Sequence, residues 1–569
     1  MSREFTVWRR LIASRNTSRA TTKACPGIPG WAFLILLVTS AGLAACGSGA
    51  DSGAGYTAEL DKAVRDRPNI IFLLTDDQRA DSLSSTSHAF SQTPNIDRLA
   101  RNGVRFANAF TVQPICAPSR FAFLSGQYER TSGLGFNSPY QVSQAQWQQT
   151  YPALLRKEGY YTGFIGKFGI QYYSFEGGAA AQFDYWRAHD GWLPFWPKDL
   201  PENPATEIYK NAEADITTEI MGEYVEEFLD TRPDDVPFNL SVSFSAPHNS
   251  IVSTMYPEGA DPNCDSYACE VMGYAANENP RLVGHPVYDR LYRNLEIEIA
   301  EDTGRDPYRF IPEGVIDHQA RRQWYDYNYD VDLQPEHLVR YHQTITGVDR
   351  VVGDLVAQLK RLGLADNTII IYSSDHGLLN GEYGTGGKAL LYDLVTKIPL
   401  IVYDPRASRP ETENEVTDLV LNIDVPATIL AYAGIPVPEA MQGRDLNSDD
   451  AKREEVFLES LTVAEGNPFI EGLRTREWKY VRYMQKFGCP YTEEQLDLSN
   501  KDPEFEQLFH LKSDPDERVN LVGVEQHAGT LERFRERIRV RSSEMTVFGR
   551  HYKENLPVDF RPEEEVFCW

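Results

Sequence analysis

Basic residues are scarce in this sequence, which has 56 Lys and Arg against 83 Asp and Glu and a net charge of −27. A protein that binds nucleic acid needs a basic surface to neutralise phosphates, so this balance argues against a nucleic-acid partner. An acidic surface also repels anionic substrates at long range, so any anion site must be a local cluster of Lys, Arg and His. With 569 residues and 41% hydrophobic content, the chain can bury a large core and form more than one domain.

Long apolar runs are also missing. The run Trp31–Val38 follows several basic residues and is too short to cross a bilayer, which takes about 20 residues. It leads to Leu-Ala-Ala-Cys46, which is similar to the bacterial lipobox, in which the cysteine is lipidated. We therefore expect a signal peptide over 1–45, a lipidated Cys46 and a lipoprotein tether over 46–66, in an exported protein anchored by lipid to a membrane of the cell envelope, in the periplasm or at the cell surface. The alternative is ordinary signal cleavage, with Cys46 incidental.

Cysteine is rare, with seven in the whole chain. Cys264 and Cys269 are close enough in sequence to bridge within one loop, and Cys489 and Cys568 could pair near the C-terminal end. Export permits disulfides but does not require them, so both pairings stay open.

Apolar strands alternate with helical segments from residue 68 onward. Pro68–Thr75 is a continuous apolar run, as expected of a strand buried on both faces of a parallel sheet. Thr93 is a suitable N-cap for a helix that starts at Pro94 and ends at Gly103. The strand Val104–Phe110 follows and leads into a loop that carries a cysteine. This strand-helix-strand unit predicts an α/β fold.

The same alternation recurs along the chain. Further helices are expected over 152–158 and 341–362, and further strands over 159–165, 238–244, 368–374 and 398–403. We predict a catalytic domain over 67–450, with a mostly parallel central sheet sandwiched by helices. A smaller C-terminal α+β subdomain over 451–569 should hold strands near 455–458 and 478–483. Residues 171–200 and 250–335 do not fit this plan, and such insertions usually build a substrate pocket.

Acidic residues end two of the predicted strands. Asp76 and Asp77 follow the first strand, and Asp375 and His376 follow the strand over 368–374. The carboxyl ends of parallel strands meet at one edge of a sheet, so we expect these side chains to lie together. Three carboxylates would repel one another unless a cation lay among them, and their oxygens suit a hard ion such as calcium. The alternative is that Asp76 caps a turn and His376 is an ordinary loop histidine.

The pentapeptide Cys116-Ala-Pro-Ser-Arg120 stands before an apolar run that ends in Leu124-Ser-Gly126. The pattern C-x-P-S-R followed by Leu-Ser-Gly resembles the signature of the type I, formylglycine-dependent sulfatases of the alkaline phosphatase superfamily. The similarity extends from about Pro68 to Leu521. Its other matching segments are residues 69–77, 93–99, 159–167, 375–388 and 508–521. Six spaced matches in order are far more specific than the pentapeptide alone.

This resemblance implies a modified nucleophile and a metal ion. A formylglycine-generating enzyme would oxidise Cys116 to formylglycine, and the hydrate of that aldehyde would attack sulfur. Calcium would be held by the modified Cys116 together with the side chains of Asp76, Asp77, Asp375 and His376.

The resemblance also implies roles for four cationic side chains. Arg120 would orient the formylglycine hydrate, and Lys167 and Lys388 would bind sulfate oxygens. His248 would hydrogen-bond the bridging oxygen or protonate the leaving group. From the residues alone, Lys388 could instead be a solvated surface lysine, and His248 could have a structural role after Pro247.

The chain departs from the family at Gly169. Many relatives carry a histidine there, which contacts the formylglycine hydrate. Gln171 and Tyr172 are candidates to replace it, or nothing does.

The function expected from these features is a sulfuric ester hydrolase that removes sulfate from a sulfated glycan. The aromatic segment 183–196 offers faces for sugar rings, or it is simply the core of an insertion. A phosphonate monoester or phosphodiester hydrolase of the same fold is one alternative. A catalytically idle, glycan-binding surface lipoprotein is the other.

Overall fold

The computed structural model describes residues 67–554, apart from a set of internal gaps. These gaps are 87–89, 137–140, 171–174, 192, 202, 256–280, 318–330, 333, 408–413, 463–466 and 489–490. The expected signal peptide and tether, Cys46 and both proposed cysteine pairs therefore lie outside the described residues. Within the described part of the chain, none of the helices combines the length and apolarity that crossing a bilayer requires.

An eight-stranded sheet forms the centre of the fold, in the order β10-β2-β9-β6-β1-β5-β3-β4. Neighbouring strands run parallel except at β9, which is antiparallel to both β2 and β6. The bounds are β1 Asn69–Thr75, β2 Val104–Phe110, β3 Tyr161–Lys167, β4 Tyr185–His189, β5 Phe238–Ser243, β6 Thr368–Ser374, β9 Leu400–Tyr403 and β10 Glu415–Leu421. The predicted mostly parallel α/β fold is confirmed.

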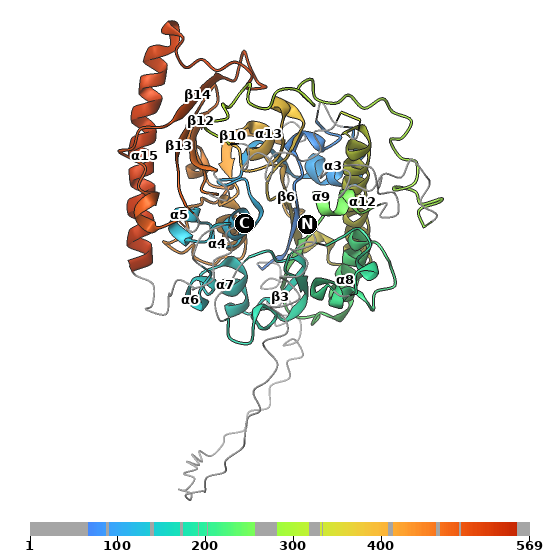
Figure 1. Ribbon diagram of the computed structural model, residues 1–569. Helices are drawn as coiled ribbons and strands as arrows, with labels where there is room; N and C mark the ends of the chain where they lie inside the picture. Colours follow the sequence, from blue (N-terminus) through green and yellow to red (C-terminus); the bar gives the residue numbers. More distant parts are fainter. Residues whose placement is uncertain are drawn as a thin grey trace, which may run out of the picture. The chain divides into compact units, whose positions relative to one another are not determined.

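Both faces of the sheet are covered by helices (Figure 1). These are α3 Pro94–Asn102, α4 Cys116–Ser125, α5 Glu129–Ser132, α6 Gln144–Trp147, α7 Tyr151–Lys157, α8 Thr217–Thr231, α9 Asn249–Ser253, α12 Gln334–Arg361, α13 Asp393–Thr396 and α14 Asp424–Tyr432. Alternate side chains of β1 enter different cores. Ile71 and Leu73 pack in the cluster that contains residues of α3, α8 and α12, whereas Phe72 packs in the cluster of α4, α7 and α14. A strand buried on both faces explains the continuous apolar run.

Helix α3 begins at Pro94 as predicted, but its cap is different. Thr93 occupies the N-cap position without making a side-chain cap bond. Instead, Oδ1 of Asp349 in α12 accepts hydrogen bonds from the backbone N–H groups of Asn95 and Ile96. A carboxylate from a distant helix therefore stabilises the free N–H groups of this helix end, which no local pattern could indicate.

The segment expected to be an insertion over 171–200 contributes a strand of the central sheet, β4. Its aromatic side chains are mostly interior: Phe183, Phe195 and Trp196 are all buried. The interpretation of this segment as a core is therefore correct for these residues, and they do not form an exposed platform for sugar rings.

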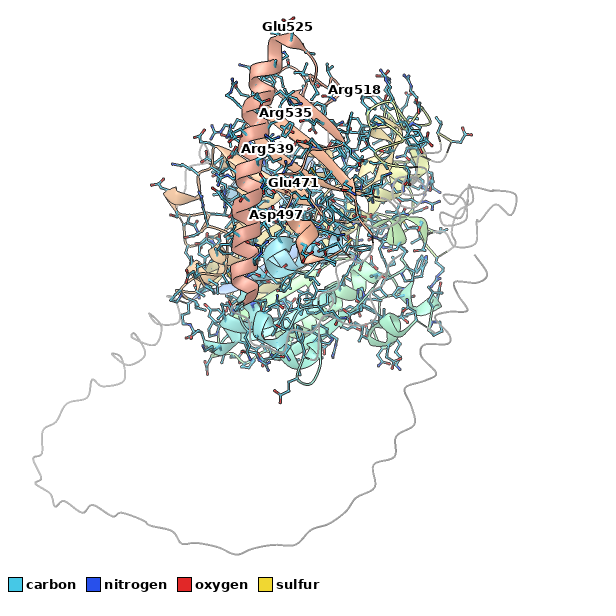
Figure 2. All side chains as sticks on the ribbon, turned by 60° about the vertical axis from the view of Figure 1, so that its left-hand side comes forward. Glu471, Asp497, Arg518, Glu525, Arg535 and Arg539 are labelled. Atoms are coloured by element: carbon cyan, nitrogen blue, oxygen red, sulfur yellow. The ribbon has the colours of Figure 1, made fainter. Side chains whose placement is uncertain are left out.

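The C-terminal part is an antiparallel sheet of order β11-β12-β13-β14, covered by the long helix α15. Its elements are β11 Glu455–Ser460, β12 Pro468–Thr475, β13 Trp478–Lys486, β14 Phe505–His510 and α15 Ala528–Glu554. Figure 2 shows α15 in front of this sheet, with Glu471 beside it. The smaller C-terminal α+β subdomain is confirmed, although the sequence indicated only two of its four strands.

Candidate active site

Four neighbouring parallel strands, β6, β1, β5 and β3, deliver side chains to one edge of the central sheet. Asp76 and Asp77 follow β1, Asp375 and His376 follow β6, and Lys167 is the last residue of β3. The expected meeting of the two acidic pairs is therefore present. Asp375 Oδ1 accepts a hydrogen bond from the Asp77 backbone N–H at 3.1 Å.

Cys116 is the first residue of α4, and its side chain is buried rather than displayed on a loop. We expected Cys116 to lie on a loop, but helix α4 begins at this residue. The Cys116 Sγ atom lies 3.7 Å from Asp76 Oδ1 and 2.9 Å from Lys388 Nζ. A helix N-terminus and an ammonium group both favour negative charge at this sulfur.

The electrostatic surroundings make Cys116 acidic. Burial opposes ionisation of the thiol, but the charges of Lys167 and Lys388 outweigh it and hold the pKa of Cys116 well below its ordinary value. The residue at the predicted nucleophile position therefore ionises more readily than an ordinary cysteine in the unmodified chain.

Arg120 lies one helical turn after Cys116 and joins two carboxylates. Its Nη2 atom is 3.1 Å from Asp76 Oδ2 and 2.9 Å from Asp375 Oδ2. Its Nη1 atom donates to the Ser243 side chain and to the Lys167 carbonyl oxygen. With 2% of its side chain exposed, Arg120 holds the acidic residues together from within the protein.

The three carboxylates have different charge preferences. Burial opposes ionisation of Asp76, yet Lys167, 2.5 Å away, and Arg120 hold its pKa well below the ordinary value. Burial and the charge of Asp76 together raise the pKa of Asp375 to about 6. Burial also opposes ionisation of Asp77, but the charge of Lys388 outweighs it and lowers the pKa of this carboxyl group. Asp76 and Asp77 therefore ionise more readily than Asp375.

Four donor side chains are gathered closely enough to bind one metal ion. Ligand atoms of Asp76, Asp77, Cys116 and His376 all lie within 4.8 Å of one another, and all four residues are buried. Asp375 is adjacent but is engaged by Arg120 and by two backbone N–H groups.

The surroundings of His376 suit a metal ligand. Its Nδ1 atom lies 3.0 Å from the Gly377 carbonyl oxygen and 3.2 Å from Asp77 Oδ1. Both neighbours are acceptors, so Nδ1 carries a proton. Burial opposes protonation of the ring, but the charge of Asp375 outweighs it and raises the pKa of His376 to about 9, so Nε2 offers its lone pair once a bound cation displaces its proton. Nε2 is buried and makes no hydrogen bond to a nitrogen or oxygen atom of the described residues. The donor set therefore fits a metal ion.

Lys388 follows a short hairpin of β7 Leu379–Asn380 and β8 Gly386–Gly387. Its ammonium group lies 2.8 Å from Asp77 Oδ1, and only 14% of its side chain is exposed. The interpretation of Lys388 as a solvated surface lysine is therefore wrong. Lys167 and Lys388 contribute two positive charges that act on Cys116. They form a local cationic cluster of the kind that an acidic protein needs to bind an anion.

His248 caps a helix and also lies beside the acidic residues of the site. Its Nδ1 atom accepts a hydrogen bond from the Ser250 backbone N–H and so caps α9. Its Nε2 atom faces the site, 3.8 Å from Asp77 Oδ2, and 21% of the side chain is exposed. Because Nδ1 is an acceptor, the proton of the neutral ring resides on Nε2, where it can be donated to a bound ligand.

Gly169 lies at the edge of the site in a left-handed conformation, with φ 64°. A Cβ atom placed on it would come within 3.1 Å of Arg120 Cδ and 3.4 Å of Lys167 Cγ. A side chain at this position would thus point at the two cations. The suggested replacements, Gln171 and Tyr172, lie outside the described residues.

Sequence reasoning missed His189, which ends β4 opposite Lys167 in the register of the β3–β4 pair. Burial and the charge of Lys167 lower the pKa of His189 to about 3, so its ring is neutral. Its Nε2 atom is 3.5 Å from Ser245 Oγ. The only signal for this residue was strand β4 itself, which the aromatic segment concealed.

The site combines a buried nucleophile position at a helix N-terminus with four potential metal ligands and several cationic side chains. This combination is typical of a hydrolase that acts on an ester of a tetrahedral oxyanion. A sulfatase family model matches residues 68–435. A second model, described as the C-terminal region of N-sulphoglucosamine sulphohydrolase, matches residues 381–544. The chain therefore belongs to the sulfatase family and is a sulfuric ester hydrolase.

A curated relative is also a sulfatase, and solved structures share the fold. The chain is 28% identical over 510 residues to an N-acetylglucosamine-6-O-sulfatase of Bacteroides thetaiotaomicron, with 83% of this chain and 85% of that protein covered. A solved structure of a protein in complex with its substrate D-glucosamine-2-N,6-O-disulfate has a TM-score of 0.59 at 22% identity, covering 88% of this chain and 100% of the other. A phosphonate monoester hydrolase from Silicibacter pomeroyi has a TM-score of 0.55 at 19% identity, covering 86% and 96%.

Proposed function

We propose that this protein removes sulfate from a sulfated glycan, with Cys116 converted to formylglycine as its nucleophile and calcium as its metal ion. The observation that carries the proposal is the position of Cys116, buried at the N-terminus of α4 between Lys388 and the carboxylate of Asp76. A formylglycine hydrate at this position would supply the attacking oxygen. The modification requires a formylglycine-generating enzyme as a partner.

Calcium would be held by oxygen atoms of Asp76, Asp77 and Asp375 together with His376 and the modified residue 116. When bound, it would neutralise sulfate oxygens as the nucleophile approaches. The donor atoms of Asp76, Asp77, Cys116 and His376, which lie within 4.8 Å of one another, support a cation here.

The remaining polar side chains of the site would bind the sulfate ester, protonate its leaving group or orient the catalytic residues. Lys167 pairs with Asp76 and Lys388 contacts residue 116, and each would bind a sulfate oxygen. His248 would donate its Nε2 proton to the bridging oxygen, so that the alcohol leaves uncharged. Arg120 is fully engaged with carboxylates and would orient residue 116 and the metal ligands rather than contact the glycan.

The aromatic side chains at 183, 195 and 196 are buried, so they do not form a surface on which a sugar ring could stack. The support for a glycan substrate comes from relatives instead. The N-acetylglucosamine-6-O-sulfatase aligns with most of this chain, and the glucosamine disulfate complex has the same fold. An exported protein with a lipidated Cys46, anchored in the cell envelope, would meet such polysaccharides.

Two measurements test the proposal. The first is mass spectrometry of the tryptic peptide Phe106–Arg120, from protein produced together with a formylglycine-generating enzyme. We expect a lighter peptide that lacks its thiol and reacts with a hydrazide. An intact, alkylatable thiol under these conditions would overturn the modification and favour the idle glycan-binding alternative.

The second measurement is sulfate release from a panel of sulfated glycans, with Cys116→Ala as the matched control. Turnover of glycans by the parent but not by the variant is expected. Equal turnover by both proteins would overturn the mechanism. Faster cleavage of an aryl phosphodiester than of any sulfate ester would favour the phosphonate monoester hydrolase alternative, whose fold the chain shares.

A further inference from the structure

The donor set of the metal cluster differs before and after conversion of residue 116. In the structure, residue 116 is the encoded cysteine, and the cluster offers a sulfur, an imidazole nitrogen and two carboxylates. Calcium prefers six to eight oxygen ligands, whereas sulfur and imidazole donors in a four-coordinate set suit Zn²⁺. The unconverted cluster is therefore chemically matched to a different metal.

We propose that the unconverted chain binds Zn²⁺ through Cys116, His376, Asp76 and Asp77, and that conversion of Cys116 abolishes this site. The Zn²⁺ site uses the same residues as the proposed function but does not require that the modification take place. The state of residue 116 thus determines which class of metal the protein holds.

The geometry supports four-coordinate binding. With Zn–S near 2.3 Å and Zn–O near 2.0 Å, a tetrahedral site separates sulfur and oxygen by about 3.5 Å. Cys116 Sγ and Asp76 Oδ1 are 3.7 Å apart. His376 is oriented by its Nδ1 contact with the Gly377 carbonyl oxygen, as histidine ligands of metals usually are.

Lys388 is the competitor of the metal ion. Its ammonium group contacts both Asp77 Oδ1 and Cys116 Sγ, at 2.8 and 2.9 Å, and so neutralises two of the four donors. Zn²⁺ binding requires this long side chain, which is 14% exposed, to withdraw toward solvent. Removing its charge should therefore tighten metal binding.

Cobalt(II) reports directly on thiolate ligation. The full chain is produced without a formylglycine-generating enzyme, freed of metal with a chelator and titrated with Co²⁺. We expect a thiolate-to-cobalt charge-transfer band in the near ultraviolet that Zn²⁺ abolishes and a Ca²⁺ excess does not. Cys116→Ala should lack the band, and this variant also controls for the other cysteines.

Two further variants sharpen the test. His376→Asn should weaken Co²⁺ binding about tenfold or more, because a nitrogen ligand is lost. Lys388→Met should tighten it about tenfold, since a competing charge is removed. Lys388→Met also keeps the proposal testable if Cys116→Ala fails to fold, which circular dichroism would reveal.

A parent protein without the band, or an equal band in Cys116→Ala, would overturn the Zn²⁺ site. Sulfate release is measured separately, on protein converted at residue 116. Failure of the cobalt titration therefore leaves the proposed function standing, and absence of sulfate release leaves the Zn²⁺ site standing.

Discussion

The acidity of Cys116 comes from neighbours that are distant in sequence. Lys167 ends β3 and Lys388 follows β8, yet both outweigh the effect of burial on the thiol. A thiolate exists at lower pH wherever positive charges lower the thiol pKa, and the thiolate is the reactive form. The reactivity of Cys116 in the unconverted protein should therefore depend less on pH than that of a free cysteine.

We predict this pH dependence for alkylation of unconverted, metal-free protein by a small thiol reagent. Because the pKa of Cys116 lies well below its ordinary value, more of its thiolate persists as pH falls from 9 to 7 than in a free cysteine, and the rate should fall less. A free cysteine loses roughly 25-fold in thiolate over the same interval. Mass spectrometry of the Phe106–Arg120 peptide measures the rate at this residue alone, and a 25-fold fall would contradict the prediction.

Gly169 provides a second residue-level prediction. Its left-handed φ of 64° costs a residue with a Cβ atom about 1–2 kcal/mol, and the added atom would press on Arg120 Cδ. Gly169→Ala should therefore lower both the free energy of unfolding and sulfate release. Gly363 is the matched control, since it is also left-handed but a Cβ atom added there would meet nothing within 4 Å.

Urea unfolding and steady-state kinetics distinguish the two variants. Both should lose similar stability, but only Gly169→Ala should lose activity. Equal activity of the two variants would show that Arg120 tolerates the contact.

The meeting of the two acidic pairs was predictable because each pair ends a strand, and strand ends of a parallel sheet meet. Lys167, Lys388 and His248 were predicted from the family resemblance alone. The pairing partners were not predictable. Asp349 caps a helix more than 250 residues away in sequence, and His189 ends a strand hidden in an aromatic segment. Such contacts depend on the packing of whole elements, which local patterns do not encode.

At the scale of elements, the hairpin β7–β8 depends on segments from two other parts of the chain. Between its strands, Tyr383 adopts a left-handed φ of 59°. Its backbone N–H donates to Asp302 at 3.3 Å, its hydroxyl donates to the Asp516 carbonyl oxygen at 2.8 Å, and its ring stacks on Tyr392 at 3.9 Å. Arg518 in turn pairs with the buried Asp302 at 2.6 Å.

These contacts place Lys388, which follows the hairpin directly. We predict that Tyr383→Ala lowers kcat/KM by about tenfold or more, since a small misplacement of a binding group is costly in a preorganised site. Tyr383→Phe retains the stacked ring and is the matched control, with an expected loss of less than about threefold. An aryl sulfate assay measures both, and a comparable loss in the two variants would mean that the ring does not position Lys388.

The expected insertion 250–335 contributes to the site only indirectly among the described residues. Asp302 supports the hairpin, whereas no residue between 281 and 317 belongs to the metal cluster. The proline, tyrosine and charged residues of this segment correctly predicted an irregular structure, but they did not indicate which residues the segment contacts.

At the scale of the whole molecule, a buried ion network joins the catalytic and C-terminal parts. Arg130 of α5 pairs with Glu459 of β11 at 2.8 Å and with Glu471 of β12. Arg482 of β13 also pairs with Glu471, and Ser542 of α15 donates to Glu471 at 2.8 Å. Two guanidinium groups and two carboxylates balance, so the network is neutral as a unit and holds these elements together.

Glu471 is the most informative position for a test of this network. Burial opposes its ionisation, but the charges of Arg130 and Arg482 hold its pKa below the ordinary value. Removing one member of a buried ion pair leaves an unbalanced charge and typically costs about 3–5 kcal/mol. We therefore predict that Glu471→Gln lowers the free energy of unfolding by about that amount, whereas Glu544→Gln, in an exposed pair with Arg541, changes it by less than about 1 kcal/mol.

Urea unfolding monitored by tryptophan fluorescence measures both variants, and activity is followed along the same titration. If the network couples the two parts, activity and fluorescence should be lost together in the parent protein and in Glu471→Gln, at a lower urea concentration in the variant. Loss of part of the fluorescence change before activity in Glu471→Gln would show instead that the catalytic part is stable without this network. The hairpin argues for joint loss, because Tyr383 and Lys388 are held partly by residues 516 and 518 of the C-terminal part.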